Sequence, residues 1–174
     1  MLLLMKNFLS ISIVIVMMLS FVACSTKSLP EEMPEDFSFE ITWGTYGVSS
    51  YDSKTGELVK TSHATNTEDY VTKYELSDEN KRLIYDYIRT LNPDDYPDEY
   101  NPNEGVYSEP SMTLILTVCA NGTEKTIKAE NIAHADDSKS TKGRRFLSTC
   151  NKITDILTSS EEWKALPDYE FLYD

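Results

Sequence analysis

Regular alternation of apolar and polar side chains predicts a long hairpin in the first half of the folded chain. Every second residue from 37 to 43 is large and apolar (Phe37, Phe39, Ile41 and Trp43), which places four large groups on one face of a strand. Gly44 and Gly47 indicate a bend, after which we expect the strand to continue over 48–51. A turn at 52–56 then leads to a return strand over 58–63, and the alternation resumes at 70–76. We expect one long, bent hairpin.

A second hairpin is predicted around Asn121-Gly122, the dipeptide most typical of a tight type I′ turn. The flanking strands cover 112–120 and 123–129. A two-residue turn fixes the register, so Ala120 should face Thr123, Leu116 should face Ile127, and Leu114 should face Ala129. These pairs predict one shared apolar face.

Apolar residues at helical spacing predict two helices. The first begins after Ser77, carries Leu83, Ile84, Tyr87, Ile88 and Leu91 as its apolar stripe, and stops at Asn92-Pro93. The second runs from about 141 to 157 and presents Phe146, Cys150, Ile153 and Leu157. Ser160 should cap a short helical turn, and the alternation at 169–173 favours a final edge strand.

Together these elements predict an α+β domain of order ββ-α-ββ-α, with an antiparallel sheet covered on one face by two helices. The two halves are similar enough to suggest an approximate internal repeat.

The N-terminal segment 5–24 is typical of an export signal. Lys6 precedes an uncharged, mostly apolar run that ends at small residues, which indicates a secretory signal rather than a membrane span. The sequence Phe21-Val22-Ala23-Cys24 resembles the lipobox of bacterial lipoproteins. This resemblance implies acylation of Cys24 with lipid such as palmitate, and a protein anchored in the cell membrane on its extracytoplasmic side. An ordinary cleaved signal and an uncleaved N-terminal helix are the alternatives.

The expected domain organisation follows from that signal. Residues 1–23 form the signal peptide, 24–36 a lipidated cysteine and an extended acidic tether, and 37–174 a single domain. The chain carries a net charge of −13, and removal of residues 1–23 takes away Lys6 and no acid. A domain with this much negative charge is repelled by phosphate backbones and by anionic lipid. We therefore expect no nucleic-acid partner. Membrane contact is expected through the lipid alone.

The segment 92–110 is the candidate interaction loop. It contains six acids, three tyrosines and four prolines but no lysine or arginine, and it is unusually long for a connection in a compact domain. Three interpretations stand: a solvated, proline-stiffened connection, a recognition surface, and a calcium site, although the acids lack the EF-hand pattern. The candidate contact residues are Asp94, Asp95, Tyr96, Asp98, Glu99, Tyr100, Glu104 and Tyr107.

A basic cluster opens the last long helix, where positive charge is unfavourable. It comprises Lys139, Lys142, Arg144 and Arg145. The acidic loop is the expected internal partner, with plain solvation or an anionic external ligand as alternatives.

Motifs for chemistry are lacking. We find no nucleophile elbow, zinc-protease, redox or phosphate-loop motif, and His63 and His134 stand far apart. We therefore expect no catalytic residues, no metal and no cofactor. Strand parity points Cys119 away from Cys150, which argues against a disulfide. The function expected is an extracytoplasmic binding or interaction module with a protein partner in or outside the envelope. The alternatives are an inhibitor or sensor of an extracellular enzyme and, less favoured, an envelope hydrolase.

Overall fold

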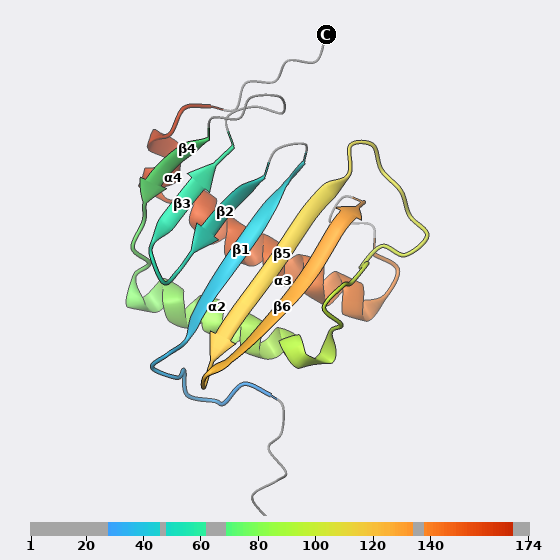
Figure 1. Ribbon diagram of the computed structural model, residues 1–174, viewed down its shortest axis with the longest axis horizontal. Coiled ribbons are helices and arrows are strands. Elements are labelled where there is room, and N and C mark those ends of the chain that lie inside the picture. Colours follow the sequence, from blue (N-terminus) through green and yellow to red (C-terminus); the bar gives the residue numbers. More distant parts are fainter. Residues whose placement is uncertain (1–27, 46–47, 62–68, 134–137, 169–174) are drawn as a thin grey trace, which may run out of the picture.

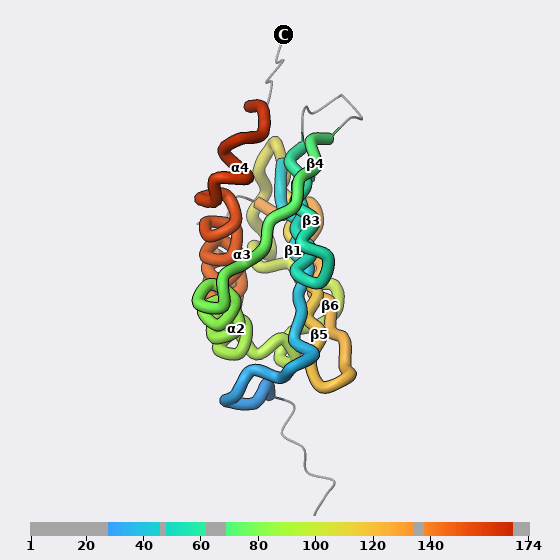
Figure 2. Tube along the Cα trace, turned by 90° about the vertical axis from the view of Figure 1, so that its left-hand side faces the viewer, coloured from blue at the N-terminus to red at the C-terminus, as the bar shows by residue number. Residues whose placement is uncertain are grey.

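The chain folds into two layers, a sheet and a layer of helices on one of its faces (Figures 1 and 2). The computed structural model describes residues 28–45, 48–61, 69–133 and 138–168. Six antiparallel strands form the sheet, in the order β4-β3-β2-β1-β5-β6. The predicted α+β class, the antiparallel sheet and the helices on one face are confirmed.

The elements have the following bounds. The strands are β1 (Ser38–Thr45), β2 (Ser49–Asp52), β3 (Glu57–Lys60), β4 (Tyr70–Lys73), β5 (Met112–Ala120) and β6 (Thr123–Ile132). The helices are α2 (Asp78–Leu91), the 3-10 turn η2 (Pro93–Asp95), α3 (Thr141–Thr158) and α4 (Glu161–Ala165). The edge strand predicted at 169–173 lies outside the described residues.

The first half of the sheet is a four-stranded meander, and the prediction of one long hairpin was wrong. Residues 48–51 do not continue β1, because β2 pairs antiparallel with it and sets Tyr51 opposite Ile41. The return strand was predicted correctly, since Tyr51 also faces Leu58 of β3. The alternation of apolar and polar residues identifies the buried face of a strand. The same alternation continues before and after a turn, so it cannot show where the chain reverses direction. Among the described residues, four strands therefore precede α2 whereas two lie between α2 and α3, which removes the basis for an internal repeat.

The second hairpin forms with the predicted register. Ala120 faces Thr123, and Leu116 faces Ile127. Asn121 and Gly122 both have positive φ, 52° and 69°, as a type I′ turn requires.

Helix boundaries follow the capping residues. The Ser77 hydroxyl accepts the N–H of Asn80 at 3.1 Å, and Asn92 ends α2 in the left-handed conformation with φ of 55°. The buried side of α2 differs slightly from the predicted stripe, because Tyr85 is buried whereas Leu83 is 39% exposed. Helix α3 starts after Ser140, and all four of its predicted core residues are buried.

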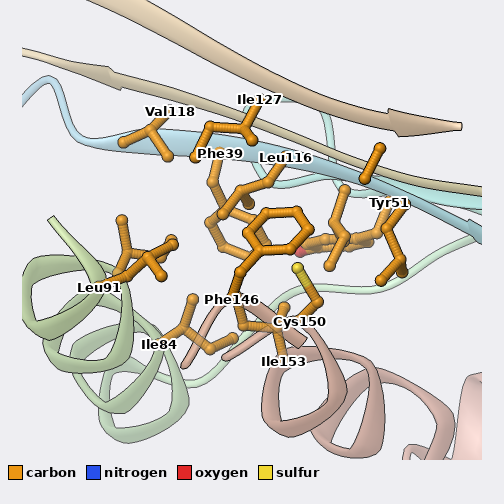
Figure 3. Packing of buried hydrophobic residues seen from close by; sticks show 14 of the residues in the cluster. Phe39, Tyr51, Ile84, Leu91, Leu116, Val118, Ile127, Phe146, Cys150 and Ile153 are labelled. Atoms are coloured by element: carbon orange, nitrogen blue, oxygen red, sulfur yellow. The ribbon is translucent and has the colours of Figure 1, made fainter. Parts of the chain in front are cut away.

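The core lies between the two layers (Figure 3). Side chains of Phe39, Leu116 and Ile127 descend from the sheet and meet those of α2 and α3, with Phe146 and Ile153 completely buried. Cys150 is also completely buried, and this burial raises the pKa of its thiol to about 12. Cys119 and Cys150 are both free, in agreement with strand parity.

Residues 28–36, here called the N-terminal strap, lie against the domain. The hydroxyl of Tyr85 donates to the carbonyl oxygen of Pro30 at 2.7 Å, and Leu29 and Met33 pack against the core. Within the segment 24–36, which was expected to be an extended tether, residues 28–36 are therefore held on the body by apolar side chains interspersed among the acids.

The strap also caps the β5–β6 turn. The carboxylate of Asp36 accepts the N–H groups of Asn121 at 2.9 Å and Gly122 at 2.7 Å. These two hydrogen bonds hold the pKa of Asp36 below its ordinary value of 3.8. Because the folded pKa is lowered, the contact contributes stability above pH 3.8 and loses it as the pH falls through the folded value.

We expect acid to release the strap at this contact. Amide NMR signals of Asn121 and Gly122 should stay constant from pH 7 to pH 4 and shift cooperatively only below 3.8, the ordinary pKa of the carboxyl group. The Asp36→Asn chain should show no such transition. A transition centred above the ordinary value in the native chain would contradict this assignment.

Candidate interaction surface

The loop 92–110 follows the β6 edge of the sheet and then rises beyond it (Figure 1). Glu99 forms a parallel bridge with Lys128 of β6. The N–H of Lys128 donates to the carbonyl of Asp98 at 2.7 Å, and the N–H of Tyr100 donates to the carbonyl of Lys128 at 2.8 Å. These bonds cover part of an otherwise open sheet edge and order the first half of the loop.

Two of the candidate tyrosines contact the core, Tyr96 as a buried member and Tyr100 as a partly buried neighbour. Tyr96 is only 4% exposed, and its ring lies 5.0 Å from that of Tyr100 and 5.8 Å from that of Phe146, between centroids. Its hydroxyl donates to the carbonyl of Lys142 at 3.1 Å. Burial raises the pKa of Tyr96 to about 12. Both rings therefore attach the loop to α3, and Tyr96 is too deeply buried to be a recognition residue, whereas Tyr100 is partly buried.

The basic start of α3 does contact the loop, but not through carboxylates. The ammonium group of Lys142 donates to the carbonyl oxygen of Asp95 and lies 4.7 Å from the ring centroid of Tyr96. Arg144 donates to the carbonyl oxygens of Ser138 and Lys139, each at 3.3 Å. Lys142 therefore contacts the loop through a backbone oxygen and aromatic faces, and Arg144 binds the segment just before α3. The expected charge pairing is not seen, because no ion pair among the described residues joins the basic cluster to a loop carboxylate.

Among the acids at the start of the loop, Asp98 has a partner. Its carboxylate pairs with the ammonium group of Lys125, and this hydrogen bond lowers the pKa of Asp98. Asp94, Asp95 and Glu99 are exposed. Lys125 was not among the predicted site residues, because it lies 27 positions further along the sequence and only the fold brings it to the loop.

The second half of the loop is anchored where it leaves the body. The carbonyl oxygen of Pro102 accepts the hydroxyl of Ser138 at 2.6 Å, and Asn103 is 1% exposed. The N–H of Val106 donates to the carbonyl of Asn103 at 2.8 Å, which closes a turn. Near the other end, the hydroxyl of Ser108 donates to the carbonyl of Pro110 at 3.1 Å, a bond within the loop itself. Residues 104–109, here called the loop tip, project between the anchored Pro102–Asn103 and the start of β5.

Tyr107 dominates the loop tip. It is 92% exposed, the most exposed of the large apolar or aromatic side chains in the part of the chain that the structure describes. Glu104 and Glu109 flank it and are also exposed, and no ion pair involves either of them among the described residues. An exposed tyrosine on an ordered loop offers a large contact area at little cost in conformational entropy.

The loop tip and the N-terminal strap lie at opposite ends of the sheet (Figure 1). Ser38, just after the strap, pairs with Cys119 near the end of β5, whereas Thr45 pairs with Met112 at its start. The loop tip precedes β5, so it lies at the far end, roughly 25 Å from the strap along β1. The chain therefore enters the domain at one end and presents Tyr107 at the other.

The described residues include neither a candidate metal-binding cluster nor a candidate membrane-spanning helix. No group of three or more histidine, cysteine, aspartate or glutamate side chains in the described ranges is arranged to hold a metal ion. The described helices include none that is long and apolar enough to cross a membrane. Cys24, His63 and His134 lie outside the described residues.

Comparisons with known proteins add no family. The chain matches no protein-family model, and no curated protein aligns with it significantly.

Proposed function

We propose that this chain is a cell-envelope lipoprotein whose domain is a binding module without catalytic activity. The lipobox-like sequence ending at Cys24 supports a lipid anchor in the cell membrane and a domain on the extracytoplasmic side. The observation that carries the binding role is the exposed Tyr107, held on an ordered loop tip at the end of the sheet opposite the strap.

The docked strap would set the orientation of the domain. Only residues 25–27 lie between Cys24 and the strap, and this segment can span at most about 14 Å. A lipid on Cys24 would therefore keep the strap end close to the bilayer, while the loop tip would stand away from it. A surface presented in this way favours contact with a protein in the envelope or outside the cell rather than with the anchoring membrane itself.

Charge indicates the kind of partner. The chain carries 29 acidic and 16 basic residues, and two glutamates flank Tyr107. Such a field attracts positively charged surfaces and speeds their association, while the tyrosine supplies the buried contact. A basic protein surface with a recess for one aromatic ring would fit the loop tip. An inhibitor that inserts the same tip into the basic cleft of an extracellular enzyme is the second candidate, because the anchor at Pro102 and the turn at Asn103–Val106 would restrict the motion of the tip before insertion.

Site-specific photocrosslinking in cells tests the proposal. A photoreactive phenylalanine derivative at position 107 should trap a defined protein, whereas the same group at position 83, exposed on α2, should not. Combining the probe at 107 with Glu104→Gln and Glu109→Gln should reduce the yield of that adduct several-fold, because the charges that attract the partner are removed. A Cys24→Ala chain, run in parallel, should leave the membrane fraction.

The controls separate the parts of the proposal. If the probes at 107 and 83 trap the same proteins, or none, the loop tip is not a binding surface. If the adduct at 107 forms but is unchanged by the two glutamate substitutions, the contact exists and the basic-partner argument fails. Retention of the Cys24→Ala chain in the membrane would refute the lipid anchor alone.

A further inference from the structure

A pocket of about 480 Å³ lies at the strap end of the domain, on the inner face of the sheet. Val118 and Ala120 of β5 line it, together with Leu29 and Pro30 of the strap and Pro93 of η2. Figure 1 shows the strap at the same end of the molecule as the β5–β6 turn. Its volume is within the range of small-molecule sites, and much of its lining is hydrocarbon.

The charges at the pocket are not balanced. Lys125 lines it, but its ammonium group is already paired with the carboxylate of Asp98. Asp94 also lines the pocket, is exposed, and forms no ion pair with any residue in the described ranges. The pocket therefore combines an apolar lining with one uncompensated negative charge.

We propose that this pocket binds a small amphiphile with an apolar chain and a positively charged head, of the alkylammonium class. The chain lies against Leu29 and Pro30 of the strap, with Val118 and Ala120, only 4% and 6% exposed, at the floor of the pocket, and the ammonium group lies beside Asp94. This site is separate from the loop tip, and its occupancy does not depend on the proposed protein partner. A carboxylate ligand of the same length is disfavoured, because it would have to displace Asp98 from Lys125 and because Asp94 repels it.

Methyl NMR of the full chain in nanodiscs of zwitterionic lipid provides the test. n-Hexylammonium should shift the methyl signals of Leu29 and Val118 saturably, with a dissociation constant on the order of 1 mM, as expected for a ligand with few heavy atoms. The methyl signals of Ile153, completely buried in the core, should not move. Ethylammonium, which has the charge without the chain, and hexanoate, which has the chain with the opposite charge, should both bind at least several-fold more weakly.

Two variants make the test specific. Asp94→Asn should weaken hexylammonium binding about threefold, which is the effect of losing one exposed ion pair. The same substitution should not weaken the binding of hexanoate. Ala120→Leu should abolish the saturable shifts by filling the pocket, with unchanged Ile153 signals showing that the core is intact. Equal binding of hexanoate and hexylammonium, or saturable shifts that survive Ala120→Leu with an intact core, would overturn the proposal. The absence of saturable shifts at Leu29 and Val118 in the native chain would overturn it as well.

Discussion

Replacing Phe146 by alanine is expected to lower the free energy of unfolding by about 3–5 kcal/mol. Phe146 is completely buried, and its ring contacts the rings of Tyr96 and Tyr100 at centroid distances of 5.8 and 5.6 Å. Truncation removes the apolar contacts of the ring and leaves a cavity that its rigid aromatic neighbours cannot fill. Denaturant unfolding followed by far-UV circular dichroism measures the loss.

The same substitution should loosen the loop, because Tyr96 and Tyr100 attach the loop to α3 through this ring. Hydrogen exchange should therefore rise at the amides of Tyr100 and Lys128, whose hydrogen bonds join the loop to β6. Tyr107→Ala is the matched control, since its ring is 92% exposed and its removal should change stability by no more than about 0.5 kcal/mol. A loss below about 1 kcal/mol for Phe146→Ala would contradict the packing described.

Gly143→Ala is expected to destabilise the domain by about 1–3 kcal/mol, against the general preference of helices for alanine. A Cβ at position 143 would lie 2.5 Å from the carbonyl oxygen of Pro102 and 2.0 Å from the hydroxyl oxygen of Ser138. The Ser138 hydroxyl can rotate away, but the Pro102 carbonyl oxygen belongs to the backbone where the loop tip is anchored. The backbone at the base of the loop tip must therefore move to make room for the added methyl group.

Ser148→Ala serves as the control for helix propensity, because Ser148 is exposed on the same helix. Alanine there should be neutral or stabilise by a few tenths of a kcal/mol. Comparing the denaturant midpoints of Gly143→Ala and Ser148→Ala separates the effect of the close contact between position 143 and Pro102 from the effect of helix propensity. Stabilisation by Gly143→Ala would show that α3 and the base of the loop tip do not meet as closely as described.

Local sequence signals predicted the elements whose boundaries rest on chemistry within a few residues. The Asn121-Gly122 turn fixes its own register, and Ser77 and Asn92 delimit α2 by capping. The β1–β2 reversal could not be predicted in this way, because apolar residues continue to alternate across it and keep the same face buried. The docking of the strap also went unpredicted, since Pro30 is held by Tyr85, a residue 55 positions away.

The candidate site was predictable in outline only. The composition of 92–110 correctly indicated an unusual surface loop, but it gave no means of separating its three tyrosines. The rings of Tyr96 and Tyr100 contact Phe146, whereas Tyr107 is exposed to solvent. The difference arises because the fold places α3 beside the start of the loop and not beside its tip. Likewise Lys125 and Ser138 carry no signal of their contacts with Asp98 and Pro102, which only the tertiary structure brings together.

We propose that the loop tip, and not the rest of the acidic surface, is where this protein binds a partner. Photocrosslinking from position 107, with position 83 as the control, is the decisive measurement. We expect a defined protein adduct from 107, absent from 83 and diminished when Glu104 and Glu109 lose their charge. Equal capture from the two positions, or none from 107, would contradict it.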